Sequence, residues 1–352
     1  MTNDCSSRPV KDVLGDWSLD GKAILITGGT GSFGQAMVAA IIKRWTPRRL
    51  VVFSRDEMKQ YEMERIFPTA SHGYLRYFIG DVRSLDRLEM AMQDIDYVIH
   101  AAALKHVPIA EYNPFECIQT NILGAENVVR AALCAGVRRV VALSTDKAVS
   151  PINLYGASKL AAEKVFVAAN HLAGRRPTRF STVRYGNVLG SRGSVLPLFR
   201  KLIAGGADSL PITDPRMTRF WITLPQGVEA VLRACATMTG GEIYVPRIPS
   251  MRMVDLARAL APGLPHRNVG IRPGEKLHET LITDHEAPLT RVNRDTGDFV
   301  ILPSFQGWEP GVPERPSAAL DPVPAEFSYT SDHNDHWLDE GALRDLLATG
   351  AV

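Results

Sequence analysis

A glycine-rich turn near the start of the chain limits the fold more than any other feature of the sequence. The segment Thr27-Gly-Gly-Thr-Gly-Ser-Phe-Gly34 follows a short apolar run of strand type at 23–26 and opens a helical stretch at 32–44. Glycines at this spacing permit a tight turn and close approach of a pyrophosphate, and the helix N-terminus adds N–H groups and positive potential. In this strand–turn–helix context the segment predicts a dinucleotide-binding unit, with a merely tight turn as the alternative.

Strand-like and helix-like segments alternate along the rest of the first half of the chain. The expected strands lie at 50–53, 75–79, 97–100, 140–143 and 180–184, and the expected helices at 56–66, 85–92, 121–135 and 158–173. This alternation predicts βαβ units that form a parallel sheet, with ligands bound at the carboxyl ends of the strands.

The second half is less regular. Residues 186–224 are rich in Gly, Pro, Arg and Ser and are expected to be mainly loop, followed by a helix at 224–238, a strand at 242–245 and a helix at 253–260. Six prolines between Pro303 and Pro324 predict an extended connector. A last helix is expected at 335–347, capped by Ser331 or Asp332, with its apolar face made by Trp337, Leu338, Leu343, Leu346 and Leu347.

These segments predict an α/β protein with a Rossmann-type, doubly wound parallel sheet and a smaller, interleaved C-terminal substrate domain. The cofactor domain would take residues 21–185 and about 226–246, and the substrate domain 186–225 and 247–352, after a leader at 1–20.

Composition excludes several classes of protein. The 352 residues are 45% hydrophobic and 22% charged, and 40 Lys and Arg against 38 Asp and Glu leave a formal net charge of +2. This balance gives no reason to expect a nucleic acid or an anionic membrane as a partner. No apolar run approaches the roughly 20 residues that span a bilayer, the N-terminus lacks the apolar core of a signal peptide, and the four cysteines are scattered. We therefore expect a cytoplasmic protein with reduced thiols.

The end of the second expected strand indicates which cofactor is bound. The segment Ser54-Arg55-Asp56, with Lys59 nearby, offers a hydroxyl and cations that suit a 2′-phosphate, which favours NADP over NAD. Asp56 has an alternative role as the cap of the helix that follows. Asp81, after the third strand, would accept from the adenine amine, and its alternative is to cap the helix at Leu85.

A tyrosine and a lysine lie four residues apart in Tyr155-Gly-Ala-Ser-Lys159, which places them on one helix face. Tyrosine has a reference pKa of about 10 and is a poor base at neutral pH. A lysine ammonium one turn away stabilises the phenolate, so we expect Tyr155 to accept a substrate proton with the help of Lys159.

Eight motifs together carry a family resemblance. They are TGGTGSFG, AAALKH, LSTDK, YGASK, RYGNV, GSRGSV, MTRFWI and RPGEKLHE. Between about residues 21 and 285 the chain resembles the extended short-chain dehydrogenases/reductases and, more narrowly, the inverting UDP-N-acetylglucosamine 4,6-dehydratases. The resemblance implies a homo-oligomer, dimer or hexamer, that binds NADP and UDP-N-acetylglucosamine.

The pair Asp146-Lys147 distinguishes this resemblance from its neighbours, because retaining dehydratases carry Asp-Glu at these positions. An Asp-Lys surface turn is the alternative. The resemblance implies that Asp146 protonates the departing C6 hydroxyl and that Lys147 removes the C5 proton. A lysine that acts as a base must be neutral, which burial and nearby positive charge would favour.

The implied reaction regenerates the cofactor in each turnover, so the enzyme would be a lyase. Tyr155, helped by Thr145 and Lys159, takes the C4 hydroxyl proton during oxidation, and water is then lost across C5–C6. The implied product is UDP-2-acetamido-2,6-dideoxy-β-L-arabino-hexos-4-ulose, for flagellin or surface-glycan sugars of the pseudaminic acid type. The alternatives are a nucleotide-sugar 4-epimerase or reductase, which needs only Thr145, Tyr155 and Lys159, and a non-catalytic NADP-binding regulator.

The resemblance also assigns the binding residues. The cofactor set is Gly28, Thr30, Gly31, Ser32, Phe33, Gly34, Ser54, Arg55, Asp56, Lys59, Asp81, Val82, Ala101, Lys105, Tyr155, Lys159 and Val188. The substrate set is Lys105, Asn187, Arg192, Val195, Thr213, Met217, Arg219, Arg272 and Glu275. The two later arginines suit a diphosphate, with structural salt bridges as the alternative. His333 and His336 lack a third ligand, and no metal is expected.

Overall fold

A ten-stranded sheet forms the centre of the molecule. The computed structural model describes residues 14–191, 193–304 and 319–348. The strand order in this sheet is β16-β14-β15-β10-β6-β5-β4-β1-β2-β3. The seven neighbouring strands from β10 to β3 in this order run parallel to one another. The main-sheet strands are β1 Ala23–Thr27, β2 Arg49–Ser54, β3 Leu75–Ile79, β4 Tyr97–His100, β5 Arg139–Thr145, β6 Arg179–Tyr185, β10 Ile243–Val245, β14 Thr290–Asn293, β15 Phe299–Ile301 and β16 Leu320–Pro322. This arrangement confirms the predicted Rossmann-type α/β fold.

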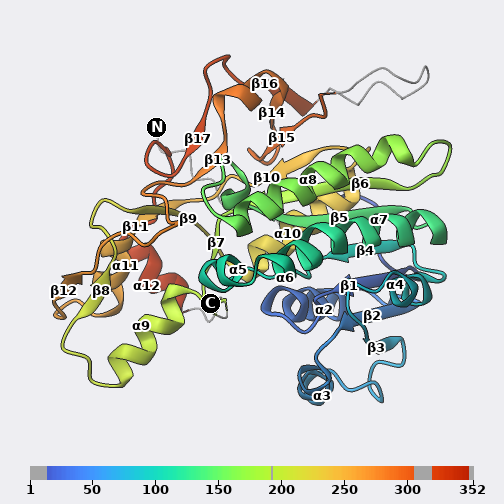
Figure 1. The fold of residues 1–352 in the computed structure, drawn as a ribbon, viewed down its shortest axis with the longest axis horizontal. Coiled ribbons are helices and arrows are strands. Elements are labelled where there is room, and N and C mark those ends of the chain that lie inside the picture. Colours follow the sequence, from blue (N-terminus) through green and yellow to red (C-terminus); the bar gives the residue numbers. More distant parts are fainter. Residues whose placement is uncertain (1–13, 192, 305–318, 349–352) are drawn as a thin grey trace.

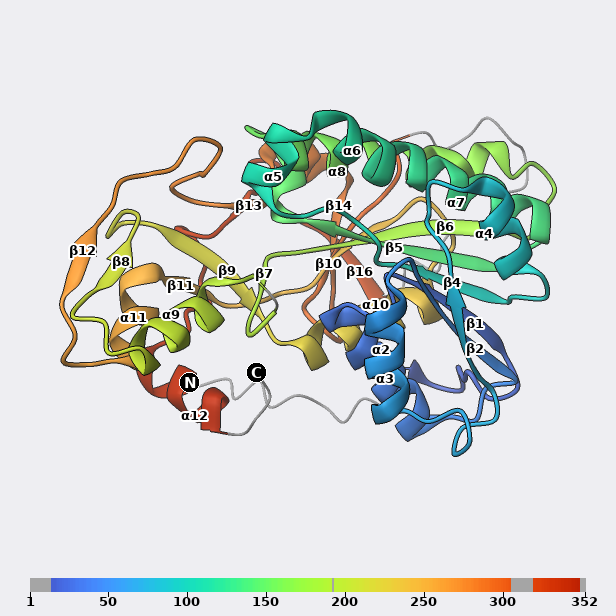
Figure 2. The ribbon, with the colours of Figure 1, turned by 60° about the horizontal axis from the view of Figure 1, so that its bottom comes forward.

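Helices cover both faces of the sheet. Figure 2 shows the sheet between these two layers of helices. On one face α2 (Ser32–Arg44) packs against α10 (Leu224–Thr237), with α3 (Glu57–Ile66) beside them. The opposite face carries α4 (Leu85–Met92), α7 (Gly124–Ala135), α8 (Leu154–Leu172), and the short helices α5 (Val107–Tyr112) and α6 (Pro114–Ile118). Each layer has its own buried apolar cluster because β1 and its neighbours are buried on both faces.

A smaller lobe lies beside the carboxyl ends of the parallel strands (Figure 1). Its core includes Leu196, Phe199, Trp221, Leu256 and Leu343. It contains α9 Val195–Ala204, α11 Met253–Leu260, α12 Glu340–Ala348 and the strands β7 Asn187–Val188, β8 Leu210–Ile212, β9 Thr218–Ile222, β11 Ser250–Arg252 and β12 His266–Asn268. Two further strands, β13 Thr280–Ile282 and β17 Tyr329–Thr330, pair with each other.

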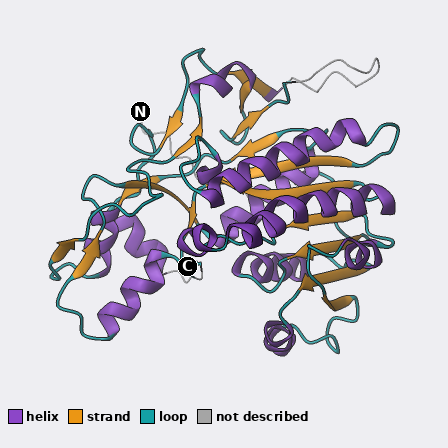
Figure 3. Cartoon of the chain, in the orientation of Figure 1, coloured by secondary structure: helices purple, strands orange, loops and turns teal. Residues whose placement is uncertain are grey.

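The expectation that 186–224 is mainly loop is wrong. Figure 3 shows a helix and strands in this lobe. The glycines of the segment lie outside its helix and strands, but Pro197 lies within α9 and Pro211 within β8, so proline does not mark loop here. Val195–Ala204 carries an apolar face whose Leu196 and Phe199 are buried in the lobe.

The last helix begins at Glu340, five residues later than predicted. Asp339 caps it, its carboxylate accepting from the N–H of Ala342 at 2.7 Å, so neither Ser331 nor Asp332 is the cap. Leu343, Leu346 and Leu347 pack into the lobe as expected. Most of the expected proline-rich connector, residues 305–318, and residues 1–13 of the expected leader lie outside the described residues.

The pairing of the strands differs in one respect from the expected division of the chain into two domains. As anticipated, α10 and β10 return to the main sheet, where β10 pairs in parallel with β6. The segment after 246 was assigned to the smaller domain alone, yet β15 extends the main sheet by antiparallel pairing of Phe299–Ile301 with β10. Apolar Phe299, Val300 and Ile301 are buried there and cover what would be an exposed edge. None of the helices in the described part of the chain is long and apolar enough to cross a bilayer.

Candidate active site

A cavity of about 680 Å³ opens at the carboxyl ends of the parallel strands, and most of the predicted site residues line it. Strand topology explains this, because the loops after β1, β2, β4, β5 and β6 all emerge at the same edge of the sheet. The predicted residues that line it are Gly28, Thr30, Gly31, Ser32, Phe33, Gly34, Ser54, Arg55, Asp56, Lys59, Asp81, Val82, Ala101, Lys105, Thr145, Lys147, Tyr155, Lys159, Asn187 and Val188.

The glycine-rich turn forms a cradle that admits no side chain at its centre. Gly28 has φ +65°, and a Cβ atom there would lie 2.8 Å from the backbone nitrogen of Ala102. Gly31 is the N-cap of α2 and contributes no side-chain cap to it. The turn therefore fits the pyrophosphate of a dinucleotide at a helix N-terminus.

The loop after β2 offers mixed chemistry to the adenosine end of a dinucleotide. The Arg55 side chain is 54% exposed, and its Nη1 lies 3.6 Å from Asp81 Oδ2. Asp56 takes its alternative role as the cap of α3, accepting from the N–H of Lys59 at 3.0 Å, and its carboxylate also lies 2.7 Å from Lys59 Nζ. Ser54 shares a hydrogen bond of 2.8 Å with Thr30.

Asp81 does not cap α4, because Ser84 performs that role. The Asp81 carboxylate instead accepts a hydrogen bond from the Arg83 guanidinium at 3.0 Å. Burial acts to raise the pKa of Asp81, but the hydrogen bonds from Arg83 outweigh it and hold the pKa below its ordinary value. Asp81 is therefore a charged acceptor in the cavity wall.

The predicted acid–base pair lies in a 3₁₀ turn, η2 (Asp146–Ala148), directly after β5. The Thr145 hydroxyl donates to Asp146 Oδ1 at 2.8 Å, and Lys147 Nζ donates to the same oxygen at 3.0 Å. Lys147 lines the cavity, whereas Asp146 is fully buried behind it and does not. Asp146 is thus connected to the cavity through Thr145 and Lys147, which both donate a hydrogen bond to it.

Lys147 is held as an ammonium ion. Burial acts to lower its pKa, but the carboxylates of Asp146 and Glu279 outweigh burial and raise the pKa above its ordinary value. The expectation that burial and positive neighbours keep Lys147 neutral is therefore wrong for this arrangement, because two carboxylates were not counted in it.

Tyr155 lies in the first turn of α8, which Asn153 caps by accepting from the N–H of Gly156 at 2.7 Å. Burial raises the pKa of Tyr155 to about 12, and the neighbouring charge that lowers it most is Lys147. From the sequence, we expected Lys159 to be the charge that stabilises the phenolate of Tyr155. The structure shows Lys159 buried with its ammonium donating to Leu143 O at 2.6 Å, and burial lowers its pKa to about 8.

Several predicted substrate residues do not line the cavity. Arg219 donates to the carbonyl oxygens of Thr218, Leu277 and Lys276 at 2.7–3.1 Å. Its Nε also lies 3.8 Å from Glu279 Oε1, as in the salt-bridge alternative for this arginine. Arg272 is 59% exposed and lies 3.8 Å from Glu275. Also outside the lining are Val195, Thr213 and Met217. Arg192 lies outside the described residues.

Two buried residues organise the site although the motifs gave them no role: Asn121, and Glu279 at the end of the RPGEKLHE motif. Asn121, in a π-helical turn (η1, Gln119–Leu123), binds both backbone groups of Leu104 at 2.8–2.9 Å and so fixes the loop that carries Lys105. Glu279 lies 3.6 Å from Lys147 Nζ. The partners of each lie far away in sequence, so the signals that could have found these residues are the unusual π turn around Asn121 and the place of Glu279 in the RPGEKLHE motif.

Within residues 14–191, 193–304 and 319–348, no group of three or more His, Cys, Asp or Glu side chains could hold a metal ion. His333 is largely exposed and lies 3.4 Å from Asp332. His278 shares a hydrogen bond of 2.8 Å with Thr218.

Comparison with known proteins places these features in context. Residues 24–297 match a family described as polysaccharide biosynthesis protein. The chain is 53% identical over 331 residues to a Campylobacter jejuni protein named UDP-N-acetylglucosamine 4,6-dehydratase (inverting), covering 93% of this chain and 98% of that one. It is 44% identical over 289 residues to a Rickettsia bellii protein named UDP-glucose 4-epimerase, covering 80% and 83%. The X-ray structure of Pen from Bacillus thuringiensis superposes with a TM-score of 0.85 at 34% identity, covering 96% of this chain and all of that one.

Proposed function

The chain belongs to the polysaccharide biosynthesis protein family, and from this premise we propose that it is an NADP-dependent UDP-N-acetylglucosamine 4,6-dehydratase that inverts C5. The observation that carries the proposal is the position of Lys147, which lines the cavity together with Thr145, Tyr155 and Lys159. A second proton-transfer group beside the tyrosine is needed for elimination and is not needed for oxidation alone. The 53% identical relative bears the same activity in its name.

NADP would be held by the glycine-rich turn, by Ser54 and Arg55, and by Asp81, all of which line the cavity. The nicotinamide would supply a reversible hydride acceptor, so that oxidation at C4 and reduction at C6 balance within one turnover. Arg55 supports NADP rather than NAD, because a guanidinium pairs well with a phosphate.

Tyr155 would take the proton of the C4 hydroxyl. Its pKa of about 12 means that it carries its own proton at neutral pH, so the phenolate must be favoured when substrate binds. Lys147 already acts in that direction, and the neighbouring Thr145 hydroxyl also lowers the pKa of Tyr155. Both neighbours line the same cavity as Tyr155.

Lys147 would remove the proton at C5 once C4 is a ketone, because the ketone acidifies that position. Asp146 would carry the proton for the departing C6 hydroxyl. Because Asp146 is a buried carboxylate in the free site, that proton would reach it and leave it through Thr145 or Lys147, which both donate to Oδ1. Return of a proton to the opposite face of C5 would give UDP-2-acetamido-2,6-dideoxy-β-L-arabino-hexos-4-ulose.

The resemblance to inverting dehydratases also supports a proposal for the compartment, the assembly and the biosynthetic role of the protein. We place it in the cytoplasm, in a homo-oligomer, in the synthesis of surface-glycan or flagellin sugars of the pseudaminic acid type. The description of the family as polysaccharide biosynthesis protein agrees with such a role.

A nucleotide-sugar 4-epimerase is the second candidate, because relatives that are 44% identical carry that name. Lys147 argues against it, since epimerisation at C4 does not require proton removal at C5. A non-catalytic NADP-binding regulator is disfavoured because Thr145, Tyr155 and Lys159 are retained in one cavity.

The test is to incubate the purified protein with NADP and UDP-N-acetylglucosamine and to analyse the sugar nucleotide by mass spectrometry. We expect a product lighter by one water, and we expect Lys147→Ala to lose its formation while it still binds NADP. A product of unchanged mass with inverted C4, or full activity of Lys147→Ala, would overturn the proposal.

A further inference from the structure

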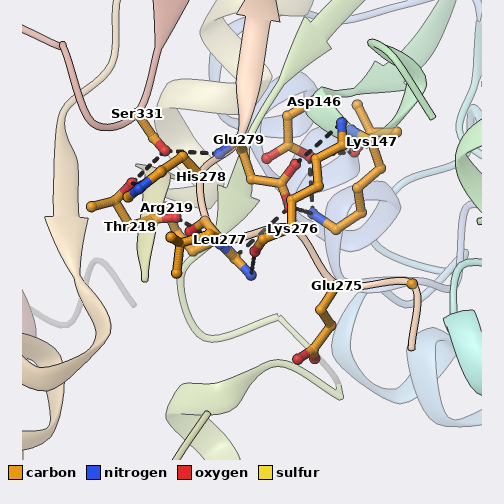
Figure 4. A network of polar contacts seen from close by, with 12 residues as sticks. Asp146, Lys147, Thr218, Arg219, Glu275, Lys276, Leu277, His278, Glu279 and Ser331 are labelled. Atoms are coloured by element: carbon orange, nitrogen blue, oxygen red, sulfur yellow. Dashed lines mark hydrogen bonds and ion pairs between the residues drawn. The ribbon is translucent and has the colours of Figure 1, made fainter. Parts of the chain in front are cut away.

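Glu279 is a buried carboxylate directly behind Lys147 (Figure 4). It precedes β13, and its backbone is fixed by Ser331, whose Oγ accepts from the N–H of Glu279 at 2.9 Å and whose N–H donates to its carbonyl at 2.8 Å. The side chain is only 3% exposed. Unlike Lys147, Glu279 does not line the cavity, so it can act on a substrate only through a neighbour.

The carboxylate of Glu279 faces three cations. Oε1 lies 3.6 Å from Lys147 Nζ and 3.8 Å from Arg219 Nε, and Oε2 lies 3.9 Å from Lys276 Nζ. Oε2 is buried and, among the described residues, has no hydrogen-bond partner. A buried carboxylate that keeps an unused acceptor has capacity for a proton.

The three cations differ in their freedom to lose a proton. Arg219 is a guanidinium held by three backbone carbonyls, and arginine does not deprotonate in proteins. Lys276 donates to Val149 O at 2.6 Å, away from the cavity. Lys147 has one carboxylate partner in Asp146 at 3.0 Å and a second in Glu279 at 3.6 Å, and it alone of the three lines the cavity.

Burial acts against the charged forms of Lys147 and Glu279, although the two carboxylates keep Lys147 an ammonium ion in the resting site. Two opposite charges lose their hydration when they are enclosed, and transfer of one proton converts them to an amine and a carboxylic acid without net charge. Burial raises the pKa of Glu279, against the opposing effect of Lys147. The remaining groups that face Glu279 are Asp146 from η2, Arg219 from β9 and Lys276 from its own loop.

We propose that Glu279 is a positioning residue that accepts the ammonium proton of Lys147 and thereby makes Lys147 a base for C5; this inference rests on the function proposed above. In the step, one N–H bond of Lys147 breaks and an O–H bond forms on Glu279, which leaves an amine facing the cavity. The amine then takes the C5 proton and becomes an ammonium ion again. No electrons leave the site. Lys147 then releases the proton taken from C5 to solvent through the cavity, and the proton on Glu279 returns to Lys147.

The test compares Glu279→Gln, which keeps the shape and removes the proton acceptor, with Asp284→Asn, which removes an exposed carboxylate five residues later. The assays are overall turnover from pH 6 to 10 and accumulation of reduced nicotinamide, which reports oxidation at C4 before elimination. For Glu279→Gln at pH 7 we expect turnover to fall by about 30-fold or more, while oxidation at C4 stays within about threefold of wild type. The loss should shrink as pH rises, because Lys147 can then release its proton to solvent. Asp284→Asn should behave as wild type.

Two further variants separate this role from a structural one. Glu279→Asp, which retains a carboxylate, should recover part of the turnover, and Glu279→Gln should cause no additional loss in a Lys147→Ala background. The proposal is overturned if Glu279→Gln keeps wild-type turnover, if it loses oxidation and elimination equally at every pH, or if it adds to the loss of Lys147→Ala. If Glu279→Gln does not fold, Glu279→Asp carries the test, and an unaltered pH profile in it overturns the proposal. Failure of the wild-type protein to dehydrate the substrate would instead contradict the proposed function itself.

Discussion

The first turn of α8 passes so close to η2 that a Cβ atom on Gly156 would overlap the carbonyl oxygen of Lys147. This contact is between two backbones, so no side-chain rotation can relieve it. Glycine at this position therefore allows the close approach of α8 and η2, whose Tyr155 and Lys147 both line the cavity.

Replacement of Gly156 with alanine should push α8 and η2 apart. We expect Gly156→Ala to lower the free energy of unfolding by about 1–3 kcal/mol, as overpacking does, and to reduce turnover by about tenfold or more. Gly227→Ala is the matched control, since the nearest atoms to a Cβ there lie at 4.0 Å and the residue is within α10. The control should keep its activity and gain up to about 1 kcal/mol from helix propensity. Equal behaviour of the two variants in thermal unfolding and turnover would contradict this account.

Burial of Lys159 predicts a specific pH dependence of stability. Its pKa is lowered from 10.5 to about 8, so between these values the folded chain binds fewer protons than the unfolded chain. Stability contributed by this group therefore rises as pH increases through that window, and below it the full penalty of burying the ammonium is present.

Comparison with Lys159→Met isolates this effect from other titrations. Without cofactor, the free energy of unfolding of wild type relative to Lys159→Met should rise by about 2–3 kcal/mol between pH 7 and pH 10. Chemical denaturation of both proteins at several pH values measures the difference. Parallel curves for the two proteins would mean that Lys159 is not perturbed as described.

Arg55 should determine the preference for NADP. Its guanidinium lines the cavity and is paired only loosely, at 3.6 Å, with Asp81. Arg55→Ala should weaken NADP binding about 10–100-fold, the value of charge-assisted hydrogen bonds to a phosphate, and change NAD binding less than about threefold. Calorimetric titration of both cofactors checks this, with Arg65→Ala on α3 as a control for net charge. An equal loss for both cofactors, or tighter binding of NAD by wild type, would refute the assignment of NADP.

A buried ion network joins the sheet to the C-terminal segment. Arg184 Nη2 lies 2.6 Å from Glu163 and 2.9 Å from Glu286, and its Nη1 donates to Leu281 O at 2.7 Å. Arg184→Met leaves the Glu163 charge buried without its partner and should cost about 3–5 kcal/mol of folding free energy.

The control for this network is Arg130→Met, which breaks an exposed pair with Glu126 and should cost less than about 1 kcal/mol. The double variant Arg184→Met/Glu163→Gln should recover part of the loss, because it removes the unpaired charge. Denaturation midpoints of the variants provide the measurement, and a cost for Arg184→Met no larger than that of Arg130→Met would show that the network contributes little.

Local patterns in the sequence were sufficient for the parallel sheet and for most of the cavity wall. The strands and the glycine turn have signals within about ten residues, and parallel topology then brings the strand ends together. Asp56 illustrates a limit of such local patterns, since a residue that contacts the cofactor and a residue that caps a helix have the same local signal. Segment α9 was missed because turn residues on both sides of it dominate the composition.

Long-range contacts explain the remaining errors. Arg219 was expected at a phosphate because of its type, but its environment depends on a loop more than fifty residues later, whose carbonyls it binds. The charge state of Lys147 was misjudged partly for the same reason: besides its sequence neighbour Asp146, the second carboxylate beside it is Glu279, which is 132 positions away and precedes the paired strand β13. Such contacts have no periodicity in the sequence from which they could be read.

The most direct test of the central claim is conversion of UDP-N-acetylglucosamine by the purified protein in D2O, followed by proton NMR. We predict a 6-deoxy-4-keto product that carries deuterium at C5, with coupling constants that report inversion at that carbon. A C4 epimer without deuterium at C5, or a deuterated product with retained configuration, would contradict the account of Lys147 as the base of an inverting dehydratase.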